Sequence, residues 1–253
     1  MKKLSTLETL NNLIRNCKNC SLFETRQYVL CGEGDINARI MLIAQAPGEF
    51  ENKEGKMFIG PSGKVLDELF KQAGLKRENF YITNLVKCML PQCRRPKQIE
   101  IQTCGNYLDR EIELVDPEFL VPLGYFAARY AFEKYGIPVP DKKEFKEVFG
   151  KLLWRMNRKI YPLQHPASVL HKPQLMEVLR KNYHKLKIFS EKCKWHSSCP
   201  LRWFTEQGKL SPRWQQLYCF GDWEDCVRYE LEESGKYHPD WMLPDGSFDE
   251  SLR

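Results

Sequence analysis

Residues 39–51 read RIMLIAQAPGEFE, and this stretch decides the fold class. The run 39–44 is short and almost wholly apolar, as is typical of a strand buried on both faces of a sheet. The turn 45–48 follows at once, and its glycine lets main chain approach a ligand closely. A buried strand that ends in such a turn indicates the carboxyl edge of a parallel sheet, where ligands collect.

Three further apolar runs are predicted as strands, and helical patterns separate them. The predicted strands are 80–85, 119–123 and 159–163, and the predicted helices are 62–73, 99–115, 125–135 and 175–189. Strands that alternate with helices favour a layered α/β domain with a largely parallel sheet. Three segments that follow strand ends then converge on one candidate site: 45–51, 84–104 and 165–170.

The composition allows one large domain, or one domain with a small appendage. The 253 residues are 42% hydrophobic and 12% aromatic, which is enough for a buried core. No apolar run reaches the roughly 18 residues that a transmembrane helix requires. The start, MKKLSTLE, lacks the apolar segment of a secretion signal, so we expect a cytoplasmic protein that does not contact membranes.

The formal charge of +6 is unevenly spread along the chain. Residues 190–253 hold 8 Lys and Arg against 12 Asp and Glu, so the rest of the chain carries a net charge of +10. A basic body favours a polyanionic partner such as nucleic acid. Solvated surface lysines explain the charge equally well.

Ten cysteines in a chain expected in a reducing compartment favour metal or cluster ligation over disulfides. Cys17-x-x-Cys20 is followed by the distant Cys88 and Cys104. Four thiolates hold either zinc or an iron–sulfur cluster, and spacing alone does not choose between them. Buried free thiols are the remaining alternative.

Five motifs in order resemble the family 4 uracil-DNA glycosylases over residues 15–188. Besides the cysteines, they are LIAQAPG at 42–48, GKMFIG at 55–60, YITNLVKC at 81–88, VPLG at 121–124 and HPAS at 165–168. The resemblance implies a three-layer α/β sandwich with a central, mostly parallel four-stranded sheet. It also implies a structural [4Fe-4S] cluster on Cys17, Cys20, Cys88 and Cys104. Cys31 and Cys93 lie outside that ligand pattern.

Excision of uracil requires the base to leave the duplex and hydrogen-bond donors to face its developing negative charge. By similarity, His165 faces uracil O2 and Phe58 stacks on the base, although Phe58 could instead be a core residue. Asn84 can donate and accept, so it can read the O4 and N3–H edge. The backbone amides of Gln45 and Ala46 are further candidate contacts.

The sequence departs from the family pattern in three places. Gln45 stands where a Glu is usual, Glu51-Asn52 replaces an acidic pair, and Cys93 replaces a polar Asn. Glu51 is therefore the candidate for orienting the attacking water. These departures leave activity on hypoxanthine, xanthine or thymine open.

Two groups of residues are expected to contact DNA. Ser168, Val169 and Leu170 are candidates for an apolar wedge in the space left by the flipped base. Lys64, Arg94, Arg95, Lys97 and Lys172 are candidates for phosphate contacts. A solvated basic face is the alternative for the second group.

We place a domain boundary near Ser190, between a glycosylase-like domain (1–189) and a small helical cysteine- and tryptophan-rich extension (190–253). A unit this small needs a crosslink such as a bound metal for stability. The candidates for a second metal site, either zinc or a second iron–sulfur cluster, are Cys193, Cys199, Cys219 and Cys226. His196 and His238 are alternative ligands, and a helical tail with unliganded thiols is the other interpretation. The acidity of the extension suggests a docking surface for a protein partner.

The leading hypothesis is a monomeric, monofunctional glycosylase that removes uracil from DNA and leaves an abasic site. Two rivals remain: a non-catalytic iron–sulfur protein that binds nucleic acid, and an enzyme that acts on a base in RNA, since fold does not determine substrate.

Overall fold

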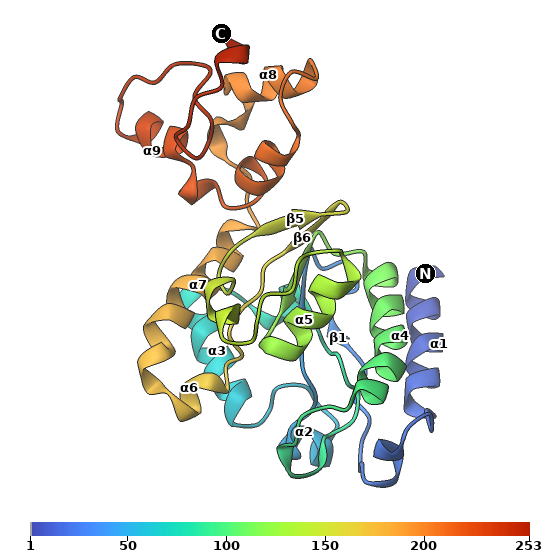
Figure 1. Ribbon diagram of the computed structural model, residues 1–253. Helices are drawn as coiled ribbons and strands as arrows, with labels where there is room; N and C mark the ends of the chain where they lie inside the picture. Colours follow the sequence, from blue (N-terminus) through green and yellow to red (C-terminus); the bar gives the residue numbers. More distant parts are fainter. Residues whose placement is uncertain (1) are drawn as a thin grey trace.

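The computed structural model describes residues 2–253, which form an α/β layered body and a separate group of short helices after residue 190 (Figure 1). The body contains a six-stranded sheet in the order β1-β3-β2-β4-β6-β5. Its strands are β1 (Glu33–Gly34), β2 (Ile40–Ala44), β3 (Phe80–Asn84), β4 (Phe119–Pro122), β5 (Leu153–Arg155) and β6 (Arg158–Ile160).

The four predicted strands form the centre of this sheet. β3, β2, β4 and β6 pair in parallel, with Ala44 opposite Asn84 at the carboxyl edge. The prediction of a four-stranded sheet was short by two, because β1 and β5 add antiparallel edges to it. Both are only two or three residues long, with β1 exposed and β5 at most partly buried, so neither has the apolar run that revealed the others.

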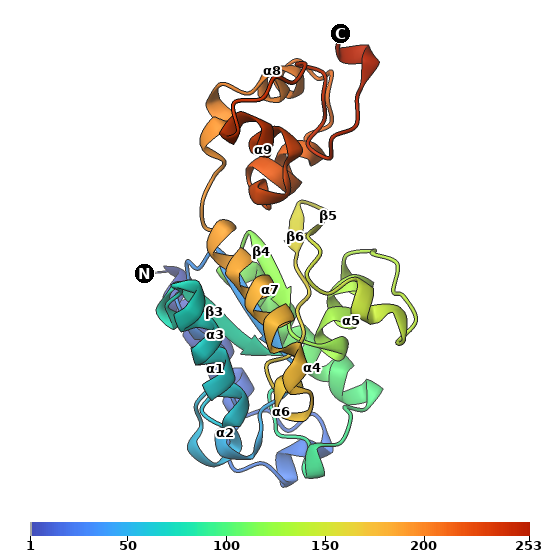
Figure 2. The same ribbon diagram turned by 90° about the vertical axis from the view of Figure 1, so that its left-hand side faces the viewer.

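Helices cover both faces of the sheet, as Figures 1 and 2 show. They are α1 (Lys2–Arg15), α3 (Pro61–Ala73), α4 (Gln98–Val115), α5 (Tyr125–Lys134) and α7 (Met176–Ile188). The shorter helices α2 (Glu49–Glu54) and α6 (Ser168–His171) lie near the carboxyl edge of the sheet. Alternate residues of each strand face opposite sides of a sheet. Met41 and Ile43 therefore join the core formed with α1, α4 and α5, whereas Ile40 and Leu42 join the core formed with α3 and α7.

The first helix was not anticipated from the sequence. α1 buries Leu7, Leu10 and Ile14 in the core that it shares with α4. Its end delivers the chain directly to Cys17 and Cys20, so the helix positions that cysteine pair against the body.

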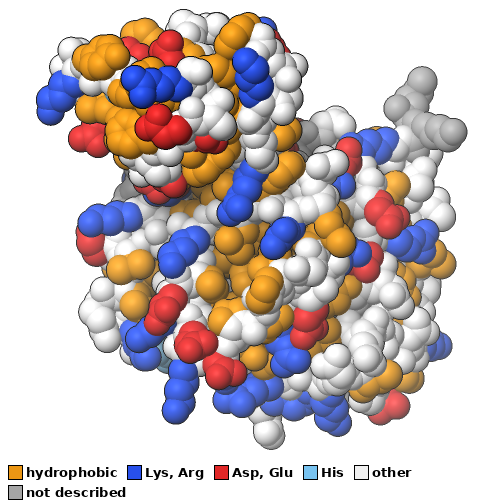
Figure 3. Space-filling view, turned by 45° about the horizontal axis from the view of Figure 1, so that its top comes forward, with side chains coloured by type: hydrophobic (Ala, Val, Ile, Leu, Met, Phe, Trp, Pro, Cys, Tyr) orange, Lys and Arg blue, Asp and Glu red, His pale blue; other side chains and the backbone are white. Residues whose placement is uncertain are grey.

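The residues after Ser190 have a small apolar core of their own. The elements are short helical turns at Lys194–Ser197 and Trp223–Asp225, a π-helical turn at Gln215–Cys219, and the helices α8 (Pro200–Glu206) and α9 (Val227–Glu233). Leu201, Phe204, Leu210, Leu243 and Leu252 form the core of this C-terminal unit. Figure 3 shows apolar side chains on its surface, with basic and acidic side chains interspersed.

The C-terminal unit contacts the body at the amino end of the parallel strands, opposite the edge where the candidate site lies (Figures 1 and 2). The buried Lys159 of β6 donates to the carbonyl of Phe220 at 2.7 Å and pairs with Glu118. Lys185 of α7 pairs with Asp222 at 2.5 Å and with Asp225 at 2.8 Å.

No helix among residues 2–253 is both long and apolar enough to cross a membrane.

Candidate base pocket and cysteine cavity

A cavity of about 240 Å³ opens at the carboxyl edge of the sheet, where the three predicted segments meet. Of the residues proposed from the sequence, Ala46, Glu51, Phe58, Asn84 and His165 line it. Gln45 is not among the lining residues. Gly48, expected from the sequence to let main chain approach a ligand, lines it as well, and four further lining residues, Ala44, Pro47, Met57 and Ser62, were not singled out from the sequence. They reach the cavity because the turn after β2 and the start of α3 face each other across it.

His165 is held as a neutral imidazole in this cavity. Burial lowers its pKa to about 4. Its Nδ1 accepts a hydrogen bond from the backbone N–H of Ala167 at 3.1 Å. A neutral ring whose Nδ1 accepts carries its proton on Nε2, so Nε2–H is available as a donor.

Phe58 packs beside His165 in a strained backbone conformation. The two rings stack with centroids 5.8 Å apart, and Phe58 has a positive φ of 51°. A bulky residue in this region is uncommon and persists only where its surroundings enforce it. Arg77 supplies part of that enforcement, because its Nη2 donates to the Phe58 carbonyl at 2.8 Å.

Glycine at position 63 is a steric requirement of the same loop. A Cβ at Gly63 would lie 1.8 Å from the carbonyl oxygen of Phe58. The first turn of α3 therefore packs directly under the Phe58 backbone. No local pattern in the sequence revealed this contact.

Glu51 and Asn84 are buried polar residues of the cavity. One carboxylate oxygen of Glu51, Oε1, accepts from the backbone N–H of Gly60 at 2.9 Å, which orients the carboxylate and leaves Oε2 toward Gly48. The Asn84 amide donates only to the thioether of Met57, at 3.1 Å. A thioether is a weak acceptor, so this amide can exchange that bond for a stronger polar partner.

The residues proposed to contact DNA differ in their environments. Lys64, Arg95, Lys97 and Lys172 are exposed. Arg94 instead forms a bidentate pair with the buried Glu100, with one N–O distance of 2.9 Å, and holds the pKa of that carboxyl below its usual range. This pairing ties Arg94 to the start of α4, so its guanidinium is already engaged.

The three residues proposed as a wedge also differ in how far they are buried. Val169 is buried in the core beneath α6, whereas Leu170 is exposed by 49%. The Ser168 hydroxyl oxygen is buried without a hydrogen-bond partner among the described residues. Leu170 is therefore the one member of this segment that presents an exposed apolar side chain.

A second cavity, of about 260 Å³, is lined by Cys17, Cys20, Cys88 and Cys104 together. Cys88 and Cys104 are buried, and burial raises the pKa of Cys104 to about 11. Arg26 donates to the Cys88 sulfur at 3.2 Å. Among residues 2–253, no three or more His, Cys, Asp or Glu side chains are gathered to hold a single metal ion. Four cysteine thiols around one cavity are a donor set that suits either zinc or an iron–sulfur cluster.

Cys31 and Cys93 lie outside this cavity. Cys93 is exposed in the loop before α4, and the Cys31 thiol faces the Asn11 carbonyl at 3.6 Å. Cys93 is thus separated from Cys88 and Cys104 although it lies between them in the sequence.

A buried ion pair connects the strand end of Asn84 to the cysteine cavity. Lys87 donates to the Glu111 carboxylate at 2.5 Å and to the Thr83 hydroxyl at 2.7 Å, and both charged side chains are essentially inaccessible to solvent. The other Glu111 oxygen accepts from the backbone N–H of Gly32 at 3.0 Å. Lys87 lies between Asn84, which lines the first cavity, and Cys88, which lines the second. This network therefore holds the two cavities in a constant position relative to each other.

Comparison with known proteins identifies what this arrangement resembles. The model of the uracil DNA glycosylase superfamily matches residues 31–191. The type-4 uracil-DNA glycosylase of Sulfurisphaera tokodaii is 36% identical over 189 residues, covering 73% of this chain and 84% of that protein. Those of Archaeoglobus fulgidus and Thermotoga maritima are 35% and 32% identical, and the matches cover 71% and 74% of this chain and 92% and 95% of the relatives.

Proposed function

Because the chain belongs to the type-4 uracil-DNA glycosylases of the uracil DNA glycosylase superfamily, we propose that it hydrolyses the N-glycosidic bond of uracil in DNA and leaves an abasic site. Membership makes it a glycosylase of DNA repair. The roles of individual residues, the cluster and the C-terminal unit are our proposals.

The observation that carries the proposal is the neutral His165 among Phe58, Asn84 and Glu51 in one cavity. We assign the Nε2–H of His165 as the donor to uracil O2, where negative charge develops as the bond breaks. A preorganised donor of this kind stabilises the transition state without reorganisation at the moment of reaction. Its low pKa supports the role, because the imidazole stays neutral across the physiological range.

The remaining pocket residues would bind and position the base. Phe58 would stack on the flipped uracil, and Asn84 would exchange its Met57 contact for the O4 and N3–H edge. Glu51 would orient water through Oε2, since Oε1 is held by Gly60. Leu170 would fill the gap in the duplex, and Lys64, Arg95, Lys97 and Lys172 would contact phosphates.

We further propose that Cys17, Cys20, Cys88 and Cys104 hold a [4Fe-4S] cluster. The donor set and the shared cavity support it. The cluster would clamp the end of α1 and the loop after β3 to α4, beside the base pocket.

We also propose that residues 1–189 are the glycosylase domain and 190–253 a distinct C-terminal unit, and that the protein acts as a monomer.

One assay tests the enzymatic proposal against its rivals. Protein purified anaerobically is incubated with labelled single- and double-stranded uracil-DNA and with RNA of the same sequence. The DNA products are treated with alkali, and free uracil released from either substrate is measured by chromatography without alkali. We expect alkali-dependent cleavage and free uracil from uracil-DNA alone. DNA binding without cleavage would establish the non-catalytic rival, and base release from RNA alone would establish the other.

A further inference from the structure

The four cysteines of the C-terminal unit, Cys193, Cys199, Cys219 and Cys226, line a single cavity. The family model ends at residue 191, before the first of them. Cys193 and Cys219 are brought together by a backbone hydrogen bond of 2.9 Å from the Cys193 N–H to the Cys219 carbonyl. Cys199 and Cys226 immediately precede α8 and α9. None of the four forms a disulfide.

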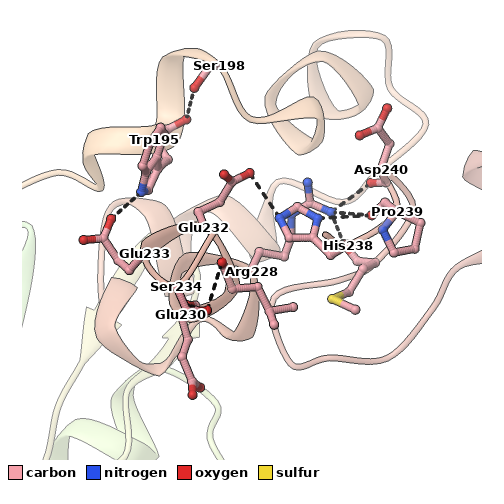
Figure 4. Close-up of polar contacts among 12 residues, drawn as sticks. Trp195, Ser198, Arg228, Glu230, Glu232, Glu233, Ser234, His238, Pro239 and Asp240 are labelled. Atoms are coloured by element: carbon pink, nitrogen blue, oxygen red, sulfur yellow. Dashed lines mark hydrogen bonds and ion pairs between the residues drawn. The ribbon is translucent and has the colours of Figure 1, made fainter. Parts of the chain in front are cut away.

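A buried cation borders the same cavity. Arg228 is 3% exposed, and its Nη1 donates to the carbonyls of Pro239, Asp240 and Met242 at 2.9–3.1 Å (Figure 4). Its Nε is buried without a partner, and it forms no ion pair with any described carboxylate. Glu232 also lines the cavity, but it pairs with His238 at 3.1 Å.

This charge requires compensation, because a buried cation without an anionic partner is strongly unfavourable. Four thiolates around a metal centre carry a net negative charge and would supply it. The first cysteine cavity, lined by Cys17, Cys20, Cys88 and Cys104, is similar, and there Arg26 donates to the Cys88 sulfur. The two cavities are therefore each lined by four cysteines and an arginine, although they lie in separate parts of the chain.

The arrangement also distinguishes between kinds of metal centre. A structural zinc ion draws its ligands to within about 2.3 Å of one point. No three described His, Cys, Asp or Glu side chains of the unit gather in that way. His196 and His238, the alternative ligands, do not line the cavity. The donors are thus four thiols around one cavity, without three or more described His, Cys, Asp or Glu side chains gathered at one point.

We propose that Cys193, Cys199, Cys219 and Cys226 bind a second iron–sulfur cluster, of the [4Fe-4S] type, that staples the C-terminal unit. The apolar core of this unit contains only five buried residues, too few to stabilise about 60 residues unaided. The cluster would join α8, α9 and the turns before them, and would lie at the opposite end of the sheet from the base pocket.

The test is metal analysis of the full-length protein, purified anaerobically after expression with iron, cysteine and zinc available. Iron, sulfide and zinc are measured per chain, with visible absorbance and electron paramagnetic resonance of the reduced sample. Two clusters predict about eight iron atoms per chain in the wild type. C219S and C226S should each lose about half of the iron and sulfide, and C104S should lose the other half.

C93S is the matched control, because Cys93 is exposed and lies outside both cavities. It should keep all of its iron. Full iron in C219S, or one zinc per chain that C219S removes, would overturn the proposal. If the variants fail to fold, about four irons per wild-type chain would overturn it just as clearly. Uracil release is measured on the same wild-type sample, so inactivity with full iron would count against the proposed function alone.

Discussion

At the residue scale, the base pocket depends on side chains whose state is set by single contacts. His165 is neutral because desolvation in the cavity lowers its pKa, and its proton is on Nε2 because Nδ1 accepts from Ala167. Phe58 keeps an unfavourable backbone conformation because Arg77 and the first turn of α3 hold its carbonyl. Each contact can be removed by one substitution.

Replacing His165 with alanine removes the donor that we assign to uracil O2. The single-turnover rate of uracil release should fall about 10²–10³-fold, while DNA binding changes little. H184A, at an exposed histidine of α7 that does not line the cavity, is the control and should keep the wild-type rate. An unchanged rate in H165A would contradict the assignment.

The low pKa of His165 predicts how excision depends on pH. Since the imidazole stays neutral until the pH falls toward about 4, its protonation should not slow single-turnover excision between pH 7 and pH 5. Activity that depends on the neutral ring should be lost only below that window. An inflection near pH 6.5 that disappears in H165Q would show instead an ordinary, exposed histidine.

Adding one methyl group at Gly63 should disturb Phe58 from beneath. The Cβ of G63A would lie 1.8 Å from the Phe58 carbonyl oxygen, so the loop must move. We expect a lower rate of uracil release and a lower melting temperature. K71A, an exposed position on the same helix, serves as the control and should resemble the wild type.

At the scale of elements, the end of β3 organises the carboxyl edge of the sheet, where the candidate site lies. Asn84 closes the strand at the base pocket, and Cys88 follows four residues later at the cysteine cavity. The Lys87–Glu111 pair between them joins this loop to α4 and to the segment before β1. The pair is buried, so losing one partner leaves an uncompensated charge in the core.

K87M should therefore lower the free energy of unfolding by about 3–5 kcal/mol, measured by urea denaturation. The control is R129A, which removes an exposed ion pair with Glu133 on α5 and should cost less than about 1 kcal/mol. Equal effects of the two substitutions would mean that the buried pair does not stabilise this edge.

At the scale of the whole molecule, the fold separates two ends of the sheet. The carboxyl edge has the base pocket and the first cysteine cavity, whereas the C-terminal unit meets the amino edge through Lys159 and Lys185 (Figure 1). The net charge of +10 belongs to residues 1–189, and the C-terminal unit is acidic. DNA is therefore expected to bind the body alone.

This charge division predicts which lysines affect the salt dependence of binding to undamaged duplex DNA. K97A should make the slope of log affinity against log salt shallower by about 0.9, the contribution of one phosphate contact. K236A, an exposed lysine of the C-terminal unit, should leave the slope unchanged. The reverse pattern would place the DNA on the C-terminal unit.

Local sequence patterns were enough to predict the strands and helices that have a regular apolar face. The four central strands and helices α3, α4, α5 and α7 were all predicted within a few residues, because each buries a regular apolar face. The same patterns placed the polar turns at the carboxyl edge, and the motifs led to the family. β1, β5 and α1 were missed, since two of them are too short to show a period.

The sequence by itself therefore determined the fold class, the family and the residues that could act. Only the tertiary structure decided which of them meet: that Arg94 is held by Glu100, that Val169 is buried while Leu170 is exposed, and that Cys193 and Cys219 share a cavity. The reason is physical. Periodicity records how one element is buried along its own axis, whereas hydrogen bonds, ion pairs and shared cavities join residues that are distant in the chain.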